Sequence, residues 1–162
     1  MTGPGGGEQA GAGKLPTVMA TIRPADMSDA PPIATLLSEL GYPAGTDDVA
    51  VRLGYWLEDA QSRLLVAEVN GHISGVAAMH AIPLLEHTGR RARLVALVVR
   101  DALRAQGVGR ALVKAAEQAA RDLSCRDMEI TSARDRAVAQ RFYARLGYND
   151  VSGRVARFMK LL

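Results

Sequence analysis

Two arginines and two glycines stand close together in the segment Arg104-Ala105-Gln106-Gly107-Val108-Gly109-Arg110. The segment follows an apolar run and opens a stretch with helical periodicity, so it is predicted to lead into the first turn of a helix. Such a turn has unpaired backbone N–H groups and the positive end of the helix dipole. Gly107 and Gly109 would let a phosphate approach the backbone, and Arg104 and Arg110 would add charge-assisted hydrogen bonds. The residue types and their spacing therefore predict a diphosphate-binding loop.

The spacing differs from that of the two best-known phosphate loops. It lacks the GxxxxGK(S/T) pattern of a nucleoside-triphosphate site and the GxGxxG pattern of a dinucleotide fold. An RxxGxG segment also arises by chance in a chain rich in Arg and Gly, and a solvated, Arg-rich surface helix is the plainer alternative. The neighbouring elements must decide between these interpretations.

Hydrophobic periodicity and turn residues predict the elements that hold this loop in place. Strands are expected at 18–23, 63–69, 73–82 and 94–99, around Met128, and from Gly153 to Leu161. Helices are expected from Asp26 or Ser28 to Leu40, at 47–59, from the loop to Leu123, and from Asp135 or a neighbour to Leu146. The Asn70-Gly71 pair predicts a tight hairpin between the second and third strands. The order β-α-α-β-β-β-α-β-α-β indicates an α+β fold with a mixed, mostly antiparallel sheet flanked by helices.

A second segment follows the loop about thirty residues later and makes the pattern more specific. The loop and its flanks read Val99-x-x-x-x-Arg104-x-Gln106-Gly107-Val108-Gly109-Arg110-Ala111-Leu112, and the later segment reads Ala139-x-x-Phe142-Tyr143-x-x-x-Gly147-Tyr148. Together they resemble the motifs of the GCN5-related N-acetyltransferase (GNAT) superfamily, and the resemblance extends over roughly Thr21 to Leu162. It implies the GNAT fold and an enzyme that transfers an acetyl group from acetyl-CoA, its co-substrate, to a primary amine.

The resemblance also implies roles for residues in both segments. Strand 96–99 would offer backbone groups to the pantetheine arm and polarise the acetyl carbonyl near Val99, and the loop would hold the pyrophosphate. Tyr143 would be the catalytic residue, a general acid that protonates the departing thiolate. The transfer would be direct, in a ternary complex and without a covalent enzyme intermediate. The residues implied in cofactor binding are Leu97, Val98, Val99, Arg104, Ala105, Gln106, Gly107, Val108, Gly109 and Arg110.

The chain departs from the family pattern at several positions. The family often has Pro, Gly and Asn where this chain has Asp101, Ala105 and Arg136. These changes keep the phosphate loop. The missing Asn removes an expected cofactor contact from the later helix, although Arg136 could reach a phosphate itself. Many members also carry a glutamate on the strand before the loop as a general base, and residues 93–99 contain no acid. The general base therefore stays unassigned.

Four other residues are candidates for the acceptor side of the site. Glu86 and His87 lie in a predicted loop, where they could deprotonate an ammonium substrate or be ordinary solvated side chains. Tyr42 and Trp56 fall where the family commonly shapes its acceptor pocket. Core packing is an equally good explanation for Trp56.

The cysteine and the histidines do not suggest redox or metal chemistry. Cys125 is the only cysteine, so no internal disulfide can form, and the cytoplasm is the expected compartment. Cys125 and the three scattered histidines make no metal cluster, so no metal is expected, and His80 and Cys125 are expected to be structural. No apolar run approaches the roughly 18 residues of a membrane span, so no membrane partner is expected.

The net charge of +3 is distributed unevenly along the chain. Residues 1–80 carry four Lys/Arg and nine Asp/Glu, a balance of −5, whereas residues 81–162 carry sixteen and eight, a balance of +8. The excess of positive charge in the second half of the chain is consistent with a diphosphate-binding site there. A nucleic-acid-binding domain is a further alternative, but two Phe, four Tyr and one Trp give it little material for base stacking, so no nucleic-acid partner is expected.

The N-terminal residues are expected to stand apart from the rest. Residues 1–18 contain six of the sixteen glycines and are predicted to be a flexible tail before one domain at 19–162. The expected partners of that domain are a small-molecule or peptide amine and, as in many family members, a second copy of the chain. The main rival to the enzyme is a non-catalytic acyl-CoA-binding or regulatory module that kept the loop and lost the base.

Overall fold

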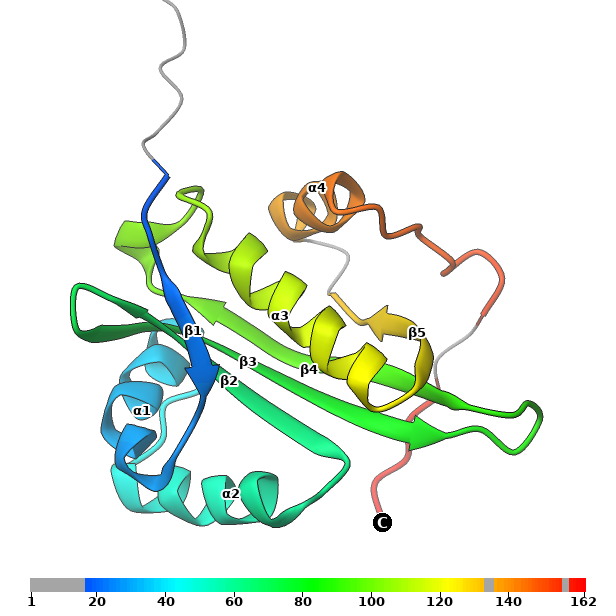
Figure 1. Cartoon of the computed structure of the whole chain (residues 1–162), viewed down its shortest axis with the longest axis horizontal. Helices are drawn as coiled ribbons and strands as arrows, with labels where there is room; N and C mark the ends of the chain where they lie inside the picture. The colour runs from blue at the N-terminus through cyan, green and yellow to red at the C-terminus, as the bar shows by residue number, and fades with distance from the viewer. Residues whose placement is uncertain (1–16, 133–135, 156–157) are drawn as a thin grey trace, which may run out of the picture.

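In the described part of the chain, five strands form one sheet in the order β1-β2-β3-β4-β5 (Figure 1). The computed structural model describes residues 17–132, 136–155 and 158–162. The strands are β1 (Thr21–Pro24), β2 (Ser62–Val69), β3 (His72–Pro83), β4 (Arg90–Val99) and β5 (Cys125–Ile130). Neighbours are antiparallel from β1 to β4, and β5 joins β4 in parallel. The sheet is therefore mixed and mostly antiparallel, as predicted.

The helices form a layer on each face of this sheet (Figure 1). They are α1 (Ala30–Glu39), α2 (Thr46–Glu58), α3 (Val108–Asp122) and α4 (Ala137–Arg145), with short 3-10 turns η1 (Met27–Asp29) and η2 (Asp101–Leu103). Helices α1 and α2 pack on one face and α3 on the other, while α4 lies beside α3 near the end of β5. No helix in the described ranges is long and apolar enough to cross a membrane. Helix α3 is the crossover that the parallel pairing of β4 and β5 requires.

Two hydrophobic clusters hold the layers together, one on each face of the sheet. On the α3 face, Leu112 and Val113 are fully buried against strand residues that include Met79 and Leu94. On the other face, residues of α1 and α2 pack against the opposite sides of β2, β3 and β4. Alternate residues of a strand point to opposite faces, so each central strand contributes to both clusters. Strand β4 is thereby fixed on both sides, and β4 leads into the predicted loop.

Tight turns confirm two of the sequence predictions. Asn70 and Gly71 take φ values of 51° and 77° and join β2 to β3. Both central residues of a type I′ hairpin turn need positive φ, which Asn and Gly tolerate best. Gly147, with φ of 93°, follows α4 as the predicted C-terminal stop.

The predicted elements differ most from the structure at the C-terminal end. The described residues of the predicted strand from Gly153 to Leu161 form no strand, and residues 156–157 of that prediction lie outside the described part. Phe158 and Met159 are 89% and 83% exposed, so the apolar pattern has no packing surface there. A strand needs a hydrogen-bonding neighbour as well as alternation. The predicted helix start at Asp135 and the predicted tail over 1–16 also lie outside the described residues, and α4 begins at Ala137.

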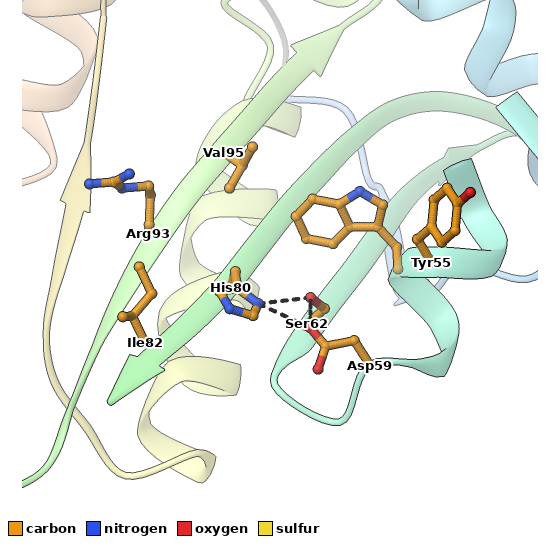
Figure 2. A pocket seen from close by; sticks show the side chains of 8 residues that line it. Tyr55, Asp59, Ser62, His80, Ile82, Arg93 and Val95 are labelled. Carbon is orange, nitrogen blue, oxygen red and sulfur yellow. Dashed lines mark hydrogen bonds and ion pairs between the residues drawn. The ribbon is translucent and has the colours of Figure 1, made fainter. Parts of the chain in front are cut away.

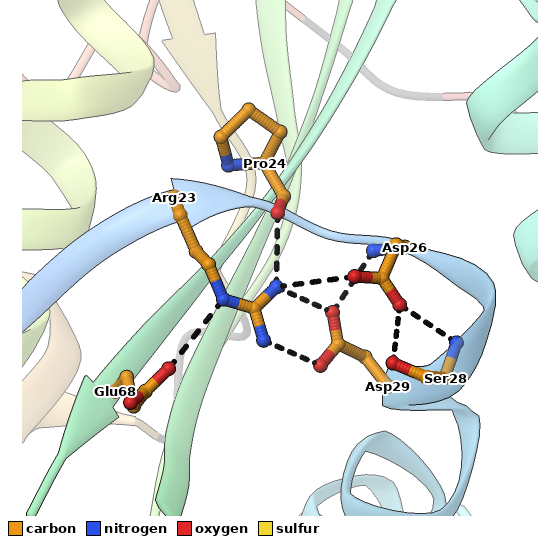
Figure 3. A network of polar contacts seen from close by, with 6 residues as sticks. All are labelled: Arg23, Pro24, Asp26, Ser28, Asp29 and Glu68. Atoms are coloured by element: carbon orange, nitrogen blue, oxygen red, sulfur yellow. Dashed lines mark hydrogen bonds and ion pairs between the residues drawn. The ribbon is translucent and has the colours of Figure 1, made fainter. Parts of the chain in front are cut away.

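A network of ion pairs fastens the end of β1 to the start of the α1 layer (Figure 3). The two terminal nitrogens of Arg23 each donate to a carboxylate oxygen of Asp29 at 2.8 Å. Arg23 also reaches Glu68 on β2, with its Nε atom 3.5 Å from the carboxylate. Asp29 is 3% exposed and accepts a further hydrogen bond from the backbone N–H of Asp26 at 2.9 Å. Asp26 in turn caps η1 by accepting from the N–H of Ser28 at 2.8 Å, as the sequence predicted for this helix start.

Candidate active site

The predicted phosphate loop connects β4 to α3 and has an unusual backbone. Ala105 takes a φ of 60°, in the left-handed region that glycine adopts more easily than alanine. The family often has Gly at this position, so the structure gives that preference a physical reason. Gly107 takes a φ of 96° and is the N-cap of α3. The loop therefore turns by means of two left-handed residues before the helix begins.

The first turn of α3 presents free hydrogen-bond donors. Within residues 17–132, 136–155 and 158–162, no side chain caps the helix, and the N–H groups of Val108, Gly109 and Arg110 have no acceptor. The exposed Arg110 side chain makes no ion pair with the described residues. Arg104 is instead held by Asp101 at 2.6 Å and donates to the carbonyl of Val99 at 3.4 Å. An anion at this helix end would thus meet backbone N–H groups and one uncommitted guanidinium.

Strands β4 and β5 part just before the loop. Their parallel pairing runs from Arg90 with Cys125 to Leu94 with Ile130, and the rest of β4 pairs only with β3. Val95 has no partner in the β3 register, so β4 carries a bulge at the point of separation. Beyond it, Leu97 and Val99 pack toward the α3 face and Val98 toward α1 and α2. The predicted cofactor strand therefore has one edge without a strand partner among the described residues, as an extended ligand would need.

Helix α4 carries Phe142 and Tyr143 of the second motif and lies next to the loop that carries the first motif. The Cβ that an alanine would have at Gly109 lies 3.5 Å from Cζ of Phe142, so the loop and α4 approach closely there. Tyr143 packs edge-on against Phe142 and Tyr148, with ring centroids 5.1 and 6.0 Å away. Burial raises the pKa of Tyr143 above its ordinary value. In the described part of the chain its hydroxyl has no hydrogen-bond partner, whereas the Tyr148 hydroxyl donates to Glu117 at 2.9 Å.

A cavity of about 390 Å³ lies on the α2 face of the sheet, next to the point where β4 and β5 part (Figure 2). Side chains from α2, from the turn after it and from the three central strands line it, namely Tyr55, Trp56, Asp59, Ser62, His80, Ile82, Arg93 and Val95. Val95 is the bulged residue of β4, so the cavity adjoins the strand segment that lacks β5. A small molecule in the cavity would therefore contact β4, the same strand along which a ligand bound at the loop before α3 would extend.

Comparison with known proteins identifies this arrangement. A family model described as acetyltransferase (GNAT) family matches residues 30–148. An aminoalkylphosphonate N-acetyltransferase from Salmonella typhimurium is 31% identical over 71% of this chain and 72% of its own length. The chain belongs to the acetyltransferase (GNAT) family. This confirms the predicted family and enzyme class, an N-acetyltransferase.

Solved structures confirm the GNAT fold. A protein from Bacillus halodurans described as a transcriptional regulator superposes with a TM-score of 0.78 at 23% identity, covering 89% of this chain and 99% of that one. An aminoglycoside N-acetyltransferase in complex with CoA gives a TM-score of 0.78 at 17% identity, covering 90% of this chain and 97% of that one. At these identities the likeness concerns the fold.

Three polar side chains meet in the cavity of this GNAT domain (Figure 2). The Ser62 hydroxyl donates to Oδ2 of Asp59 at 2.7 Å, and Nδ1 of His80 lies 3.1 Å from the same oxygen and 3.0 Å from the hydroxyl. The backbone N–H of Gln61 and the Ser62 hydroxyl hold the pKa of Asp59 below its ordinary value. An imidazole held through Nδ1 by an ionised carboxylate is a recurrent arrangement for a base. His80, which the sequence predicts to be structural, makes these contacts in the lining of the cavity.

Of the four residues that the sequence suggests for the acceptor side, one lines the cavity and three do not. Trp56 lines the cavity, as the family position predicted, whereas Tyr42 does not and is 64% exposed. Glu86 and His87 are exposed in the turn between β3 and β4 and do not line the cavity. Burial raises the pKa of the Cys125 thiol, which disfavours the thiolate that a nucleophile requires.

Gly107 and Gly109 are expected to respond differently to alanine. Gly107→Ala places a Cβ on a left-handed residue and 3.2 Å from Thr17 Cγ2, so it should lower the free energy of unfolding by about 1–2 kcal/mol and weaken acetyl-CoA binding. Gly109→Ala meets only ordinary contacts, 3.5 Å from Phe142 and 3.6 Å from Val99, and alanine favours the helix by about 0.5–1 kcal/mol. Urea unfolding and calorimetric titration measure both effects. Equal destabilisation by the two substitutions would contradict the assigned role of Gly107.

Proposed function

We propose that this GNAT protein transfers the acetyl group of acetyl-CoA directly to a primary amine in a ternary complex. The observation that carries the proposal is the continuous path from the uncapped N-terminus of α3, along the unpaired edge of β4, to the cavity beside Val95. The relative that acetylates aminoalkylphosphonates and the CoA-bound aminoglycoside acetyltransferase of similar fold support this reaction. We place the activity in residues 19–162.

The residues of the loop fit a CoA diphosphate. The free N–H groups of Val108, Gly109 and Arg110 point to an anion site, and the uncommitted guanidinium of Arg110 adds charge. Backbone groups of Leu97, Val98 and Val99 would hold the pantetheine arm on the edge of β4 that β5 leaves. Acetyl-CoA supplies an activated thioester at the end of that arm. The chain's own contribution is to orient it and to exclude water from its reacting end.

Tyr143 is the proposed general acid. Its raised pKa keeps the phenol protonated at neutral pH, which suits a group that must give a proton to a departing thiolate. Its hydroxyl is not engaged by any described residue, unlike that of Tyr148. The two tyrosines therefore differ in availability although they lie on the same side of the fold.

The cavity favours a small amine as the acceptor. A volume of about 390 Å³ accommodates a small molecule or the end of a side chain, and Tyr55 and Trp56 give it an aromatic wall. Arg93, which shares its charge with Glu129 on β5, and Asp59 border the cavity from two sides, which suits an amine that also carries an anionic group. Aminoalkylphosphonates have this character, and they are the first compounds to test beside aminoglycosides, polyamines, amino acids and peptides.

Calorimetric titration with acetyl-CoA tests whether the protein binds its proposed co-substrate. We expect binding with a Kd below about 1 mM and a stoichiometry of one per chain, because the N-terminus of α3, the edge of β4 and Arg110 act together. Intersecting lines in double-reciprocal plots of the initial rates would then agree with a ternary complex, whereas parallel lines would indicate a covalent intermediate. A folded sample that binds no acetyl-CoA in the millimolar range would refute the proposal.

A further inference from the structure

His80 occupies a position from which it could accept a proton inside the cavity. The single hydroxyl proton of Ser62 is donated to Asp59, and the ionised carboxylate can only accept. Nδ1 of His80 lies 3.1 Å from that carboxylate, and this contact favours the tautomer with a proton on Nδ1. The neutral ring then has its lone pair on Nε2, for which the described residues provide no partner. The Asp59–Ser62 pair thus fixes the tautomer that a base needs.

The cavity in which this lone pair lies also adjoins the segment of β4 on which the acetyl thioester is proposed to lie. His80 pairs with Arg93 across β3 and β4, and Val95 stands two residues further along β4 at the bulge. All three line the same cavity (Figure 2). An amine between His80 and Val95 would lie beside the strand edge on which the proposed function places the acetyl thioester. The strand 93–99 has no acid of its own, so no residue there competes for the role.

We propose that His80 is the general base of the transferase and that Asp59 is its positioning residue. This inference rests on the proposed function. Nε2 of His80 takes a proton from the substrate ammonium, and the freed amine nitrogen forms a bond to the acetyl carbon as the carbon–sulfur bond breaks. The sulfur leaves as a thiolate and takes the proton of Tyr143, and the second proton that the nitrogen loses as the amide forms restores the Tyr143 phenol. His80 then releases its proton to water, so the balance is one amide, one thiol and one proton per ammonium and thioester.

Charged groups from three elements lie around His80. Asp59, from the turn after α2, has its carboxylate 3.1 Å from Nδ1, and Arg93, from β4, lines the same cavity. Glu129 on β5 pairs with Arg93 and offsets much of its charge. Among the described residues, Asp59 is therefore the charged group in contact with the ring, as a positioning residue must be.

The test compares His80→Gln with His72→Gln, a matched change at the exposed start of β3 outside the cavity. We expect kcat at pH 7 to fall about 100-fold in His80→Gln and to change less than twofold in His72→Gln. With a base in the site, the wild-type kcat should depend less steeply on pH than the kcat of His80→Gln. In His80→Gln, kcat should rise about tenfold per pH unit toward the pKa of the amine itself. Added imidazole should restore at least a tenth of the activity, and acetyl-CoA affinity should stay within twofold.

The Asp59→Asn variant provides a second measurement, which a purely structural loss of packing would not reproduce. Without the carboxylate the Nδ1 proton of His80 loses its charged acceptor, so kcat should fall about tenfold while the KM for the amine and the Kd for acetyl-CoA stay within about twofold. A His80→Gln enzyme with wild-type kcat would overturn the proposal, and a wild-type kcat in Asp59→Asn would overturn the positioning role. A wild-type protein that binds acetyl-CoA but turns over no amine would overturn the proposed function as well, and so the two failures are distinguishable.

Discussion

Replacing Tyr143 by phenylalanine is expected to lower kcat by about 100-fold or more and to leave the Kd for acetyl-CoA within about twofold. The substitution removes one oxygen and keeps the ring that packs against Phe142 and Tyr148. The thiolate must then leave without a proton donor, which raises the barrier of the transfer step only. Single-turnover kinetics with pre-bound acetyl-CoA measure that step directly.

Tyr148→Phe is the matched control for this experiment. It also removes one phenolic oxygen, but that hydroxyl donates to Glu117 at 2.9 Å and is a structural group. We expect a loss of about 1 kcal/mol in the free energy of unfolding and kcat within about threefold of wild type. If Tyr143→Phe instead lost acetyl-CoA affinity and kcat to the same degree, Tyr143 would be a packing residue and not an acid.

Asp29→Asn is expected to lower the free energy of unfolding by about 2–3 kcal/mol at pH 7, the typical contribution of hydrogen bonds to charged groups. The carboxylate is buried and accepts two hydrogen bonds from Arg23, at 2.8 Å each, and one from the backbone of Asp26 (Figure 3). An amide can accept on one atom only, so it breaks the paired contact. Asp26→Asn is the control, since an exposed Asn caps a helix as well as Asp does. Urea unfolding of the two variants should separate them clearly.

The same contact predicts how stability depends on pH. The hydrogen bonds from Arg23 lower the pKa of Asp29 in the folded state below its ordinary value. A lowered pKa means that the unfolded chain binds the proton more readily, so the contribution is complete above about pH 4 and fades as the pH falls through the folded-state pKa. The difference between wild type and Asp29→Asn should therefore shrink on acidification. A difference that stayed constant from pH 7 to pH 2 would contradict this account.

Local patterns in the sequence were sufficient for most of the fold and for the turn between β4 and α3. The Asn70-Gly71 hairpin and the Gly107 turn depend on backbone conformations that particular residues favour, and both are found at the predicted places. Hydrophobic spacing located α3, the crossover helix, because its apolar stripe has to face the sheet. Features of this kind need no knowledge of distant contacts.

The cavity could not be predicted because it depends on strand register. The two-residue hairpin alone would place Ser62 opposite Met79, but a bulge between Ala67 and Glu68 shifts the pairing by one residue and brings Ser62 opposite His80. A second bulge, at Val95, decides which side chains of β4 face α2. A single sequence carries no clear mark of either bulge. The proposed base, His80, lies beside Asp59 and Ser62 because of this register, whereas Glu86 and His87 lie in the exposed turn between β3 and β4.

The most direct test of the central claim is the release of CoA from acetyl-CoA in the presence of single amines, with the mass of each amine measured afterwards. We expect that at least one small amine, with aminoalkylphosphonates tested first, gains one acetyl group and that CoA is released in an equal amount. A folded protein that binds acetyl-CoA and acetylates no amine of the panel would contradict it, as would CoA release without an acetylated product.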